Sequence, residues 1–514
     1  MPEDQQDKPT STPTITPTTT PTTAASDTAT RPAEPVDDLV STRHRLRVGR
    51  RTLDYTATTG RVVLREEVHE DGVFVGHQAK AEISITSYVV DRAEDETGPN
   101  RRPVTFAFNG GPGSSSVWLH LGLLGPRRIV MGDAGDLRPP PYDLTDNHES
   151  LLAESDLVLI DPVSTGYSRA VRGTKPEPFH GYQGDVESIA ELIRLWTTRH
   201  ERWLSPKLLL GESYGTLRGV ALVERLQSRY GMYVNGLVLV SSVLDLSSID
   251  FDNQRNDRAH ALYLPTYAAI AHYHGRLGGR GSLRKAVRDA EEYAARDYPW
   301  VLAQGDRLSA KDRAAAVKRL AALTGLSPDY VDRADLRIEH WRFFGELLRD
   351  RRQTAGRVDG RFVGPAANGI AEHMDADASM DAISGPYSTA YNHYVRHELR
   401  YENDLPYEQI SSRVHPWSFK DFEGRPIDVS PLLERAMRTN PHLKVHVAYG
   451  YYDGATPHYA AEDVLAHLQL PDELRANIEH AYYEAGHMMY VHEPSRLQQS
   501  KDLADFVRRC TPPS

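Results

Sequence analysis

The chain has 514 residues, of which 39% are hydrophobic and 25% charged, values typical of a globular protein with a sizeable core. Its formal net charge is −11 and it has no dense run of Lys and Arg, which argues against binding to nucleic acid. No stretch stays apolar over the roughly 20 residues that cross a bilayer, so the sequence does not predict membrane insertion.

Residues 1–40 are rich in Thr and Pro and nearly free of large apolar side chains. Such a segment cannot bury enough surface to offset the entropy of ordering, so we expect a disordered tail. It has neither the basic nor the apolar region of a signal peptide. The single cysteine, Cys510, cannot form an intramolecular disulfide, which is typical of a reducing compartment. Together these features favour a cytoplasmic protein.

Residues 41–245 predict the first part of an α/β domain. Up to about residue 91, apolar and polar residues alternate, as in strands with one exposed face. Short, continuous apolar runs follow, of the kind found in strands that are buried on both faces. These runs cover residues 104–108, 156–161, 206–211 and 235–242.

Helical patterns separate the apolar runs, which predicts a mostly parallel central sheet flanked by helices. The clearest pattern covers residues 185–200, where Val186, Ile189, Ile193 and Trp196 recur at helical spacing. Asp185 is placed to cap the start of this helix.

Residues 246–440 interrupt the sheet pattern. They contain helical stretches and no run typical of a buried strand, so we expect a helical cap insertion. Strand-like runs return at residues 443–450 and 477–487. Residues 441–514 are therefore expected to complete the α/β domain.

Ser213 lies within the sequence Gly-Glu-Ser-Tyr-Gly, residues 211–215, between an apolar run and a helical pattern. In this context the motif G-x-S-x-G forms a sharp turn that exposes the serine above the N-terminus of a helix, where negative charge is favoured. Ser213 is therefore the candidate nucleophile. The alternative interpretation is a purely structural glycine-rich turn.

A nucleophilic serine needs a histidine as base and a carboxylate that orients the histidine. In a strand–turn–helix context the acid and then the histidine follow the serine along the chain, each after a late strand. Asp453 and His487 occupy these positions. The alternatives that fit them less well are Asp463, His458, His480 and His492.

The glycine-rich turn at residues 109–113, Asn-Gly-Gly-Pro-Gly, follows the apolar run at 104–108. Acyl transfer needs backbone N–H groups that bind the developing oxyanion. One is expected from Tyr214, the residue after the nucleophile, and the other from a glycine-rich turn after an earlier strand. The serines at 114–116 are expected to begin a helix instead of taking part in the chemistry.

Together these motifs resemble the serine carboxypeptidases, peptidase family S10. The resemblance rests on residues 109–113, residues 211–214, Asp453 and residues 486–488, and it fades through the insertion. It implies an α/β-hydrolase fold with a helical cap and, as its activity, release of one residue from the C-terminus of a peptide. No cofactor or metal is implied.

The resemblance also implies a role for each matching residue. The catalytic residues would be Ser213, Asp453 and His487. The oxyanion amides would be those of Gly111 and Tyr214. The substrate's terminal carboxylate would bind to Asn109, the amide of Gly110 and a protonated Glu212, so binding would favour low pH. A local hydrogen bond within the turn is the alternative role for Glu212.

Three positions depart from the family's pattern. Leu123 stands where the family usually has a second acid that is hydrogen-bonded to the first. His120, one turn earlier, is either a replacement for that acid or a plain helix-face residue. Ser114 replaces a cysteine, consistent with a disulfide-free version of the family. The segment 161–168 is slightly shorter than usual and has Ser164 in place of a glycine.

The sequence therefore predicts a serine carboxypeptidase that acts on peptides with a free C-terminus through a Ser-His-Asp triad and an acyl-enzyme. An acyltransferase or esterase on the same scaffold is the alternative, which differs in the group that attacks the acyl-enzyme. Loss of the second acid at Leu123 favours this alternative. A non-catalytic binding protein is a third class. No feature of the sequence predicts an oligomeric state.

Overall fold

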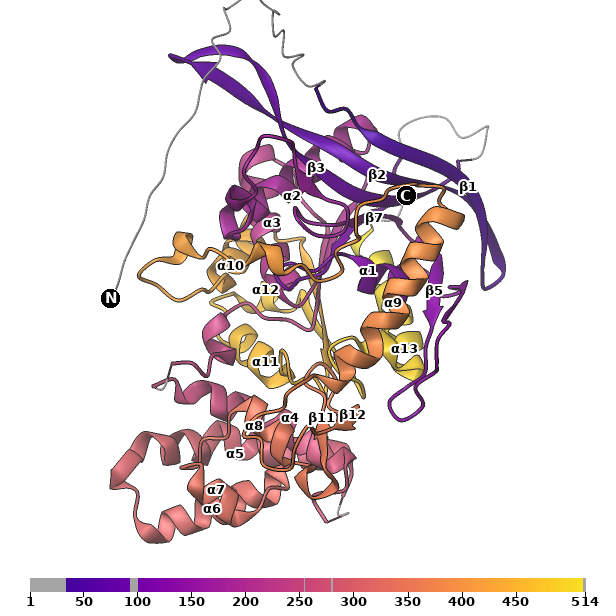
Figure 1. The fold of residues 1–514 in the computed structure, drawn as a ribbon. Helices are drawn as coiled ribbons and strands as arrows, with labels where there is room; N and C mark the ends of the chain where they lie inside the picture. Colours follow the sequence, from indigo (N-terminus) through magenta and orange to yellow (C-terminus); the bar gives the residue numbers. More distant parts are fainter. Residues whose placement is uncertain (1–33, 93–99, 254, 279–280, 512–514) are drawn as a thin grey trace, which may run out of the picture. The chain divides into compact units, whose positions relative to one another are not determined.

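The computed structural model describes residues 34–92, 100–253, 255–278 and 281–511. Within these ranges the central feature is a ten-stranded sheet in the order β1-β2-β3-β7-β4-β9-β10-β13-β14, with β8 paired to β3. Figure 1 labels β1, β2, β3 and β7 of this sheet. The strands are β1 (Asp38–Val48), β2 (Arg51–Glu70), β3 (Val73–Val90), β4 (Val104–Phe108), β7 (Asp156–Ile160), β8 (Arg169–Ala170), β9 (Lys207–Glu212), β10 (Gly236–Val240), β13 (Lys444–Gly450) and β14 (Ile478–Tyr483).

The strand directions follow the two sequence patterns. β1, β2 and β3 alternate in polarity and pair antiparallel, whereas β7, β4, β9, β10, β13 and β14 pair parallel to one another. Every residue of β4, β7, β9 and β10 is buried, as expected of strands covered on both faces. The predicted α/β fold with a mostly parallel central sheet is confirmed.

The beginning of the chain corrects one predicted boundary. Residues 1–33 of the expected tail lie outside the described residues. β1 begins at Asp38, inside the segment 1–40 that was expected to be a tail. Residues 38–40 are part of a strand because they pair with residues 59–61 of β2.

Helices cover both faces of the parallel strands. Alternate side chains point to opposite faces, so Leu209 belongs to one hydrophobic cluster with α2, α3 and α10, while Leu208 and Leu210 belong to another with α1, α9 and α13. These helices are α1 (Val117–Leu119), α2 (Tyr182–Arg199), α3 (Tyr214–Tyr230), α9 (Ala378–His397), α10 (Ser430–Thr439) and α13 (Glu493–Cys510). α11 (His458–Ala466) and α12 (Asp472–Arg475) connect β13 to β14.

Asp185 does not cap α2, contrary to the prediction. The helix begins at Tyr182, with Gly181 in the capping position. Asp185 instead lies in the first turn and forms a buried ion pair with Arg218 of α3, at 2.7 Å. The pattern of apolar residues begins one turn after the helix does, which is why it misplaced the start.

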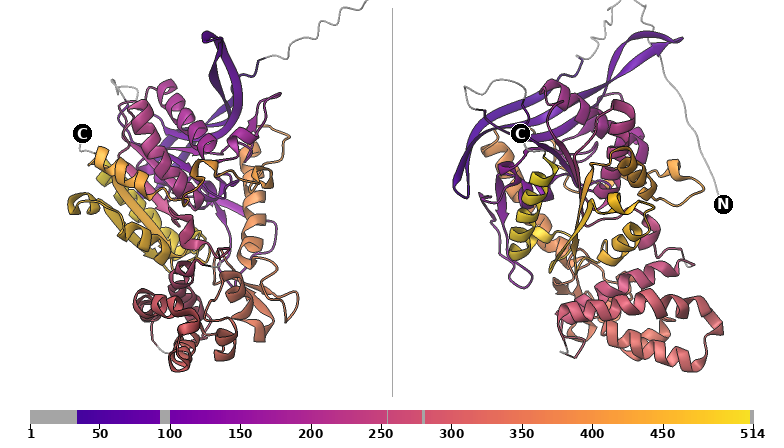
Figure 2. Two further views of the ribbon diagram at one scale, coloured as in Figure 1. Left: turned by 90° about the vertical axis from the view of Figure 1, so that its left-hand side faces the viewer. Right: turned by 180° about the vertical axis from the view of Figure 1, so that it is seen from behind.

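The predicted insertion, residues 246–440, has two structurally distinct portions. α4 to α8 have a hydrophobic cluster of their own and gather at the end of the molecule away from β1–β3 (Figure 2). In contrast, α9 and α10 add side chains to the two clusters of the sheet. The elements of the first portion are α4 (Asp257–Tyr273), α5 (Leu283–Gln304), α6 (Ala310–Thr324), α7 (Pro328–Arg333), α8 (His340–Glu346) and the short hairpin of β11 (Gln353–Ala355) and β12 (Val363–Pro365).

Three further observations concern membranes, metals and disulfides. Within the described ranges, no helix combines the length and apolarity that a bilayer span requires. The same residues contain no group of three or more His, Cys, Asp and Glu side chains that could hold a metal ion. Cys510 is buried on α13, and burial raises the pKa of its thiol to about 12.

A second small antiparallel hairpin consists of β5 (Arg127–Val130) and β6 (Asp143–Asp146).

Candidate active site

The predicted site residues gather at the carboxyl ends of the parallel strands. Here they surround a cavity of about 380 Å³. Seven of the eight line it: Asn109, Gly110, Gly111, Glu212, Ser213, Tyr214 and His487. The eighth, Asp453, is fully buried and bonded to His487. The alternative candidates do not line this cavity: Asp463, His458, His480 and His492.

Ser213 occupies the sharp turn between β9 and α3, with φ 61° and ψ −131°. This conformation is costly for a residue with a side chain and is typical of an exposed nucleophile. The flanking glycines make the turn possible, because a Cβ on Gly211 would lie 2.0 Å from the carbonyl oxygen of Gly215. Ser213 is thereby held at the floor of the cavity, at the N-terminus of α3.

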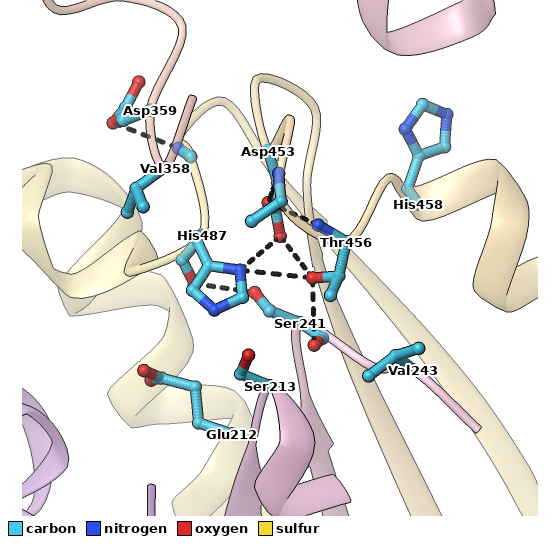
Figure 3. A network of polar contacts seen from close by, with 12 residues as sticks. Glu212, Ser213, Ser241, Val243, Val358, Asp359, Asp453, Thr456, His458 and His487 are labelled. Carbon is cyan, nitrogen blue, oxygen red and sulfur yellow. Dashed lines mark hydrogen bonds and ion pairs between the residues drawn. The ribbon is translucent and has the colours of Figure 1, made fainter. Parts of the chain in front are cut away.

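His487 and Asp453 form the central polar contact of the site. His487 Nδ1 lies 2.8 Å from Asp453 Oδ2 (Figure 3). Asp453 Oδ1 accepts the backbone N–H groups of Ala455 and Thr456, at 2.8 and 2.9 Å, and the Thr456 hydroxyl lies 2.8 Å from Oδ2. Burial lowers the pKa of His487, but the charge and hydrogen bond of Asp453 outweigh it, and the pKa lies above its usual value.

Ser213 lies on the side of the His487 ring opposite Asp453, with its side chain directed toward the ring (Figure 3). The three side chains therefore follow one another in the order that a Ser-His-Asp triad requires.

Hydrogen bonds to residues of the insertion fix the main chain around His487. The His487 N–H donates to the carbonyl of Val358 at 2.7 Å, and the Gly486 N–H donates to Asp359 Oδ2 at 3.2 Å. On the other side, the Ser241 hydroxyl donates to the His487 carbonyl at 2.6 Å. These bonds hold the main chain of His487 from two segments that are far apart in the sequence, residues 358–359 and Ser241.

The two turns that were expected to supply oxyanion donors are in direct contact. A Cβ on Gly110 would lie 2.4 Å from the backbone nitrogen of Tyr214, so only glycine allows this approach. Gly111 has φ 102°, a backbone conformation that favours glycine. Among the described residues, no acceptor is bonded to the N–H of Gly111 or of Tyr214. Both groups are therefore available to a ligand in the cavity.

Glu212 is 3% exposed and has two hydrogen-bond partners. Asn109 Nδ2 donates to its Oε1 at 2.7 Å, and the Tyr490 hydroxyl donates to its Oε2 at 2.8 Å. Burial raises the pKa of Glu212 to about 7, while the charge of His487 and both hydrogen bonds oppose that rise. Glu212 is therefore protonated at acid pH and ionises near neutral pH.

Tyr490 was not predicted. It follows His487 in the chain, whereas the resemblance to the carboxypeptidase family predicted a second acid in the segment after the glycine turn. Leu123 is buried in the hydrophobic cluster to which α1, α9 and α13 contribute, where an apolar side chain belongs. His120 does not replace the missing acid: its Nε2 lies 2.6 Å from the Tyr88 hydroxyl, and burial lowers its pKa to about 3. Tyr490 is thus the second partner of Glu212.

Two of the serines after the glycine turn have structural contacts, and Ser116 occupies the capping position of α1 without a capping hydrogen bond from its side chain. Ser116 precedes α1 and donates its backbone N–H and its hydroxyl to Asp161 Oδ1, at 2.8 and 2.7 Å. The Ser114 hydroxyl accepts the indole N–H of Trp118 at 2.8 Å. The bonds of Ser116 join the segment after the turn to Asp161, and the bond of Ser114 is local to that segment.

Comparison with known proteins agrees with the motifs. Residues 87–263 match the family model described as serine carboxypeptidase, peptidase family S10. A curated protein, serine carboxypeptidase-like 45 from Arabidopsis thaliana, is 25% identical over 170 residues. That alignment covers 32% of this chain and 34% of the relative, so the chain matches about a third of the relative's length. The resemblance to the serine carboxypeptidases is confirmed.

Two solved structures are similar to this chain to different degrees. A prohormone-processing carboxypeptidase from Saccharomyces cerevisiae is similar with a TM-score of 0.54 and 13% identity, over 89% of this chain and 91% of that one. A proline iminopeptidase from Mycobacterium smegmatis is similar with a TM-score of 0.33 and 11% identity, over 87% of this chain and 99% of that one. The first of these similarities supports the fold of the α/β-hydrolases.

Proposed function

We propose that this chain, which resembles the serine carboxypeptidase family, is a serine-type carboxypeptidase that releases the C-terminal residue of a peptide. The single observation that carries the proposal is one cavity lined both by Ser213 and His487 and by two groups suited to a carboxylate, Asn109 and Glu212. A nucleophile and a carboxylate-binding site in one cavity would select a peptide by the carboxylate at its C-terminus.

In the proposed mechanism, the Ser213 hydroxyl attacks the scissile carbonyl while His487 Nε2 takes its proton. Asp453 Oδ2 accepts a hydrogen bond from the Nδ1–H of His487 and thereby keeps Nε2 free to act as a base. The protonated His487 then gives its proton to the leaving amine, and an acyl-enzyme remains on Ser213. Water, activated by His487, hydrolyses this ester and regenerates the hydroxyl.

The developing oxyanion would bind to the N–H groups of Gly111 and Tyr214. Both groups lack an acceptor among the described residues, and Tyr214 is the first residue of α3. The helix N-terminus adds a partial positive charge at this point. Preorganised donors of this kind lower the barrier because they need no reorientation as the charge forms.

The terminal carboxylate of the substrate would bind to the Asn109 amide, the Gly110 N–H and the protonated carboxyl of Glu212. A neutral Glu212 donates a hydrogen bond to the carboxylate, whereas an ionised one repels it. Tyr490 holds the carboxyl of Glu212 in position in the absence of a second acid, while its hydrogen bond favours the ionised form. Glu212 keeps two hydrogen-bond partners, Asn109 and Tyr490, and this favours a carboxypeptidase over the acyltransferase or esterase alternative.

A set of three matched substrates tests the proposal: a blocked dipeptide with a free carboxylate, its C-terminal amide and a simple ester. We expect cleavage of the free acid and little cleavage of the amide, from acid to neutral pH. Cleavage of the ester alone would contradict a carboxypeptidase and support the alternative.

The pH dependence of KM depends on Glu212. For the free acid we expect KM to rise as the pH increases through about 7, because Glu212 then loses the proton that it donates to the substrate. The amide, which has no charge at its end, shows no such step. In Glu212→Gln the step disappears, since an amide does not titrate there, and KM for the free acid at acid pH rises by about 10-fold. An equal rise in KM for the amide would reject the carboxylate role.

Tyr490→Phe is expected to move the same step to higher pH. The Tyr490 hydroxyl bonds to the ionised form of Glu212 and lowers its pKa, so its loss raises the pKa further. The expected shift in the KM profile is on the order of one pH unit. Tyr483→Phe is the matched control, because Tyr483 is also buried but donates to Asp502, outside the cavity. Identical profiles for wild type and Tyr490→Phe would show that Tyr490 does not act on Glu212.

A further inference from the structure

Arg357 is the one charged residue of the insertion that lines the candidate active site within the described ranges. It lies between β11 and β12, and its side chain is half-buried. The next two residues, Val358 and Asp359, hold the main chain of residues 486–487. The position of Arg357 is therefore fixed relative to His487.

The guanidinium of Arg357 has no acidic partner among the described residues. Its buried Nε has no hydrogen-bond partner. The Asp377 carboxylate, which reaches this loop, accepts the backbone N–H groups of Arg357 and Val358, both at 3.1 Å, and not the guanidinium. The contact that orients the side chain is with Trp341 of α8, whose ring centroid lies 5.3 Å from Arg357 Cζ.

A partly desolvated guanidinium without a counter-charge is unfavourable, and a carboxylate is the group that it binds best. The other ionisable groups of the cavity do not supply one: His487 is a base, and Glu212 is engaged by Asn109 and Tyr490. The counter-charge is therefore missing until a ligand brings it.

We propose that Arg357 binds the side-chain carboxylate of an acidic residue next to the scissile bond, so that Asp and Glu are preferred at that position of the substrate. The inference rests on the proposed carboxypeptidase function. In that function the terminal carboxylate already has its own partners in Asn109, Gly110 and Glu212, so Arg357 is left to select a side chain.

Two pairs of blocked dipeptides test the inference. In one pair the C-terminal residue is Glu or Gln, and in the other the residue before it is Glu or Gln. We expect the wild-type protein to cleave the Glu member of at least one pair faster. Arg357→Met should lower kcat/KM for that peptide by about 10-fold to 100-fold and leave its Gln counterpart within about 2-fold. Arg357→Lys should retain part of the preference, since it keeps the charge.

Arg342→Met is the control, because Arg342 lies beside Trp341 on α8 but forms an ion pair with Glu372 and does not line the cavity. This variant should keep the preference for Glu. Equal losses for the Glu and Gln peptides in Arg357→Met would overturn the inference. So would a loss that separates free acids from their amides regardless of the side chain, since Arg357 would then bind the chain end.

A binding measurement separates this inference from the proposed function. Calorimetry on Ser213→Ala should show tighter binding of the Glu peptide than of the Gln peptide, and the double variant Ser213→Ala/Arg357→Met should lose the difference. If the preference in binding is present but the wild type cleaves none of the peptides, the proposed function fails and the role of Arg357 stands. No preference in binding overturns the role of Arg357.

Discussion

Replacing Ser213 with alanine is expected to lower kcat/KM for a blocked dipeptide by roughly 10⁴-fold or more, because the acyl-enzyme can no longer form. The turn itself should survive, since Ala lacks only the hydroxyl and the strained backbone at φ 61° is set by the neighbouring glycines. Steady-state rates and covalent labelling by a serine-directed fluorophosphonate measure the loss: the wild type is labelled and Ser213→Ala is not.

Ser114→Ala is the matched control for the nucleophile. Ser114 lines the same cavity, but its hydroxyl accepts the indole N–H of Trp118. We expect this variant to stay within about 10-fold of the wild-type rate, since it loses one neutral hydrogen bond. If Ser114→Ala were inactive and Ser213→Ala active, the assignment of the nucleophile would be wrong.

Replacing Asp453 with asparagine is expected to lower kcat by about 10⁴-fold. The Oδ1 position faces two backbone N–H groups, those of Ala455 and Thr456, so the Asn oxygen should occupy it. The NH₂ group then faces His487 Nδ1 and stabilises the tautomer whose proton is on Nε2. Such an imidazole cannot accept the proton of Ser213.

Thr456→Val separates this effect from the packing around Asp453. The Thr456 hydroxyl lies 2.8 Å from Asp453 Oδ2, 3.0 Å from the carbonyl of Ser241 and 3.1 Å from His487 Nδ1. Its removal leaves the bond between Asp453 and His487 in place, so we expect a loss in kcat of about 10-fold or less. Thermal unfolding checks that both variants are folded. A kcat for Asp453→Asn close to that of Thr456→Val would exclude Asp453 as the orienting acid.

The sheet could be predicted because its signal is local. A strand that is buried on both faces needs consecutive apolar residues, and the runs at 104–108, 156–161 and 206–211 became β4, β7 and β9. Placement of the site residues followed from the same strands, since the motifs around Asn109 and Ser213 come directly after them. Parallel neighbours end at one edge of the sheet, so motifs at strand ends meet in space.

Contacts that arise only from the tertiary fold could not be predicted. The bond between Tyr490 and Glu212 joins residues from the two halves of the domain, and no local pattern distinguishes Tyr490 from other buried tyrosines. Arg357 lies in the insertion, where helical periodicity reports which residues form helices but not which loop reaches the cavity. The start of α2 was misplaced for a related reason: Asp185 is a good capping residue by type, but its partner is Arg218 of another helix.

The hydrogen bonds that residues 486–487 donate to Val358 and Asp359 would make the insertion part of the proposed catalytic machinery instead of a mere cover. A shortened chain that joined residue 245 directly to residue 441 would keep Ser213, Asp453 and His487. It would lose the two acceptors that hold the main chain of the histidine. In the proposed mechanism the base would not be aligned until the inserted segment has docked, so we expect a half-folded molecule to be inactive even with the nucleophile and the acid in place.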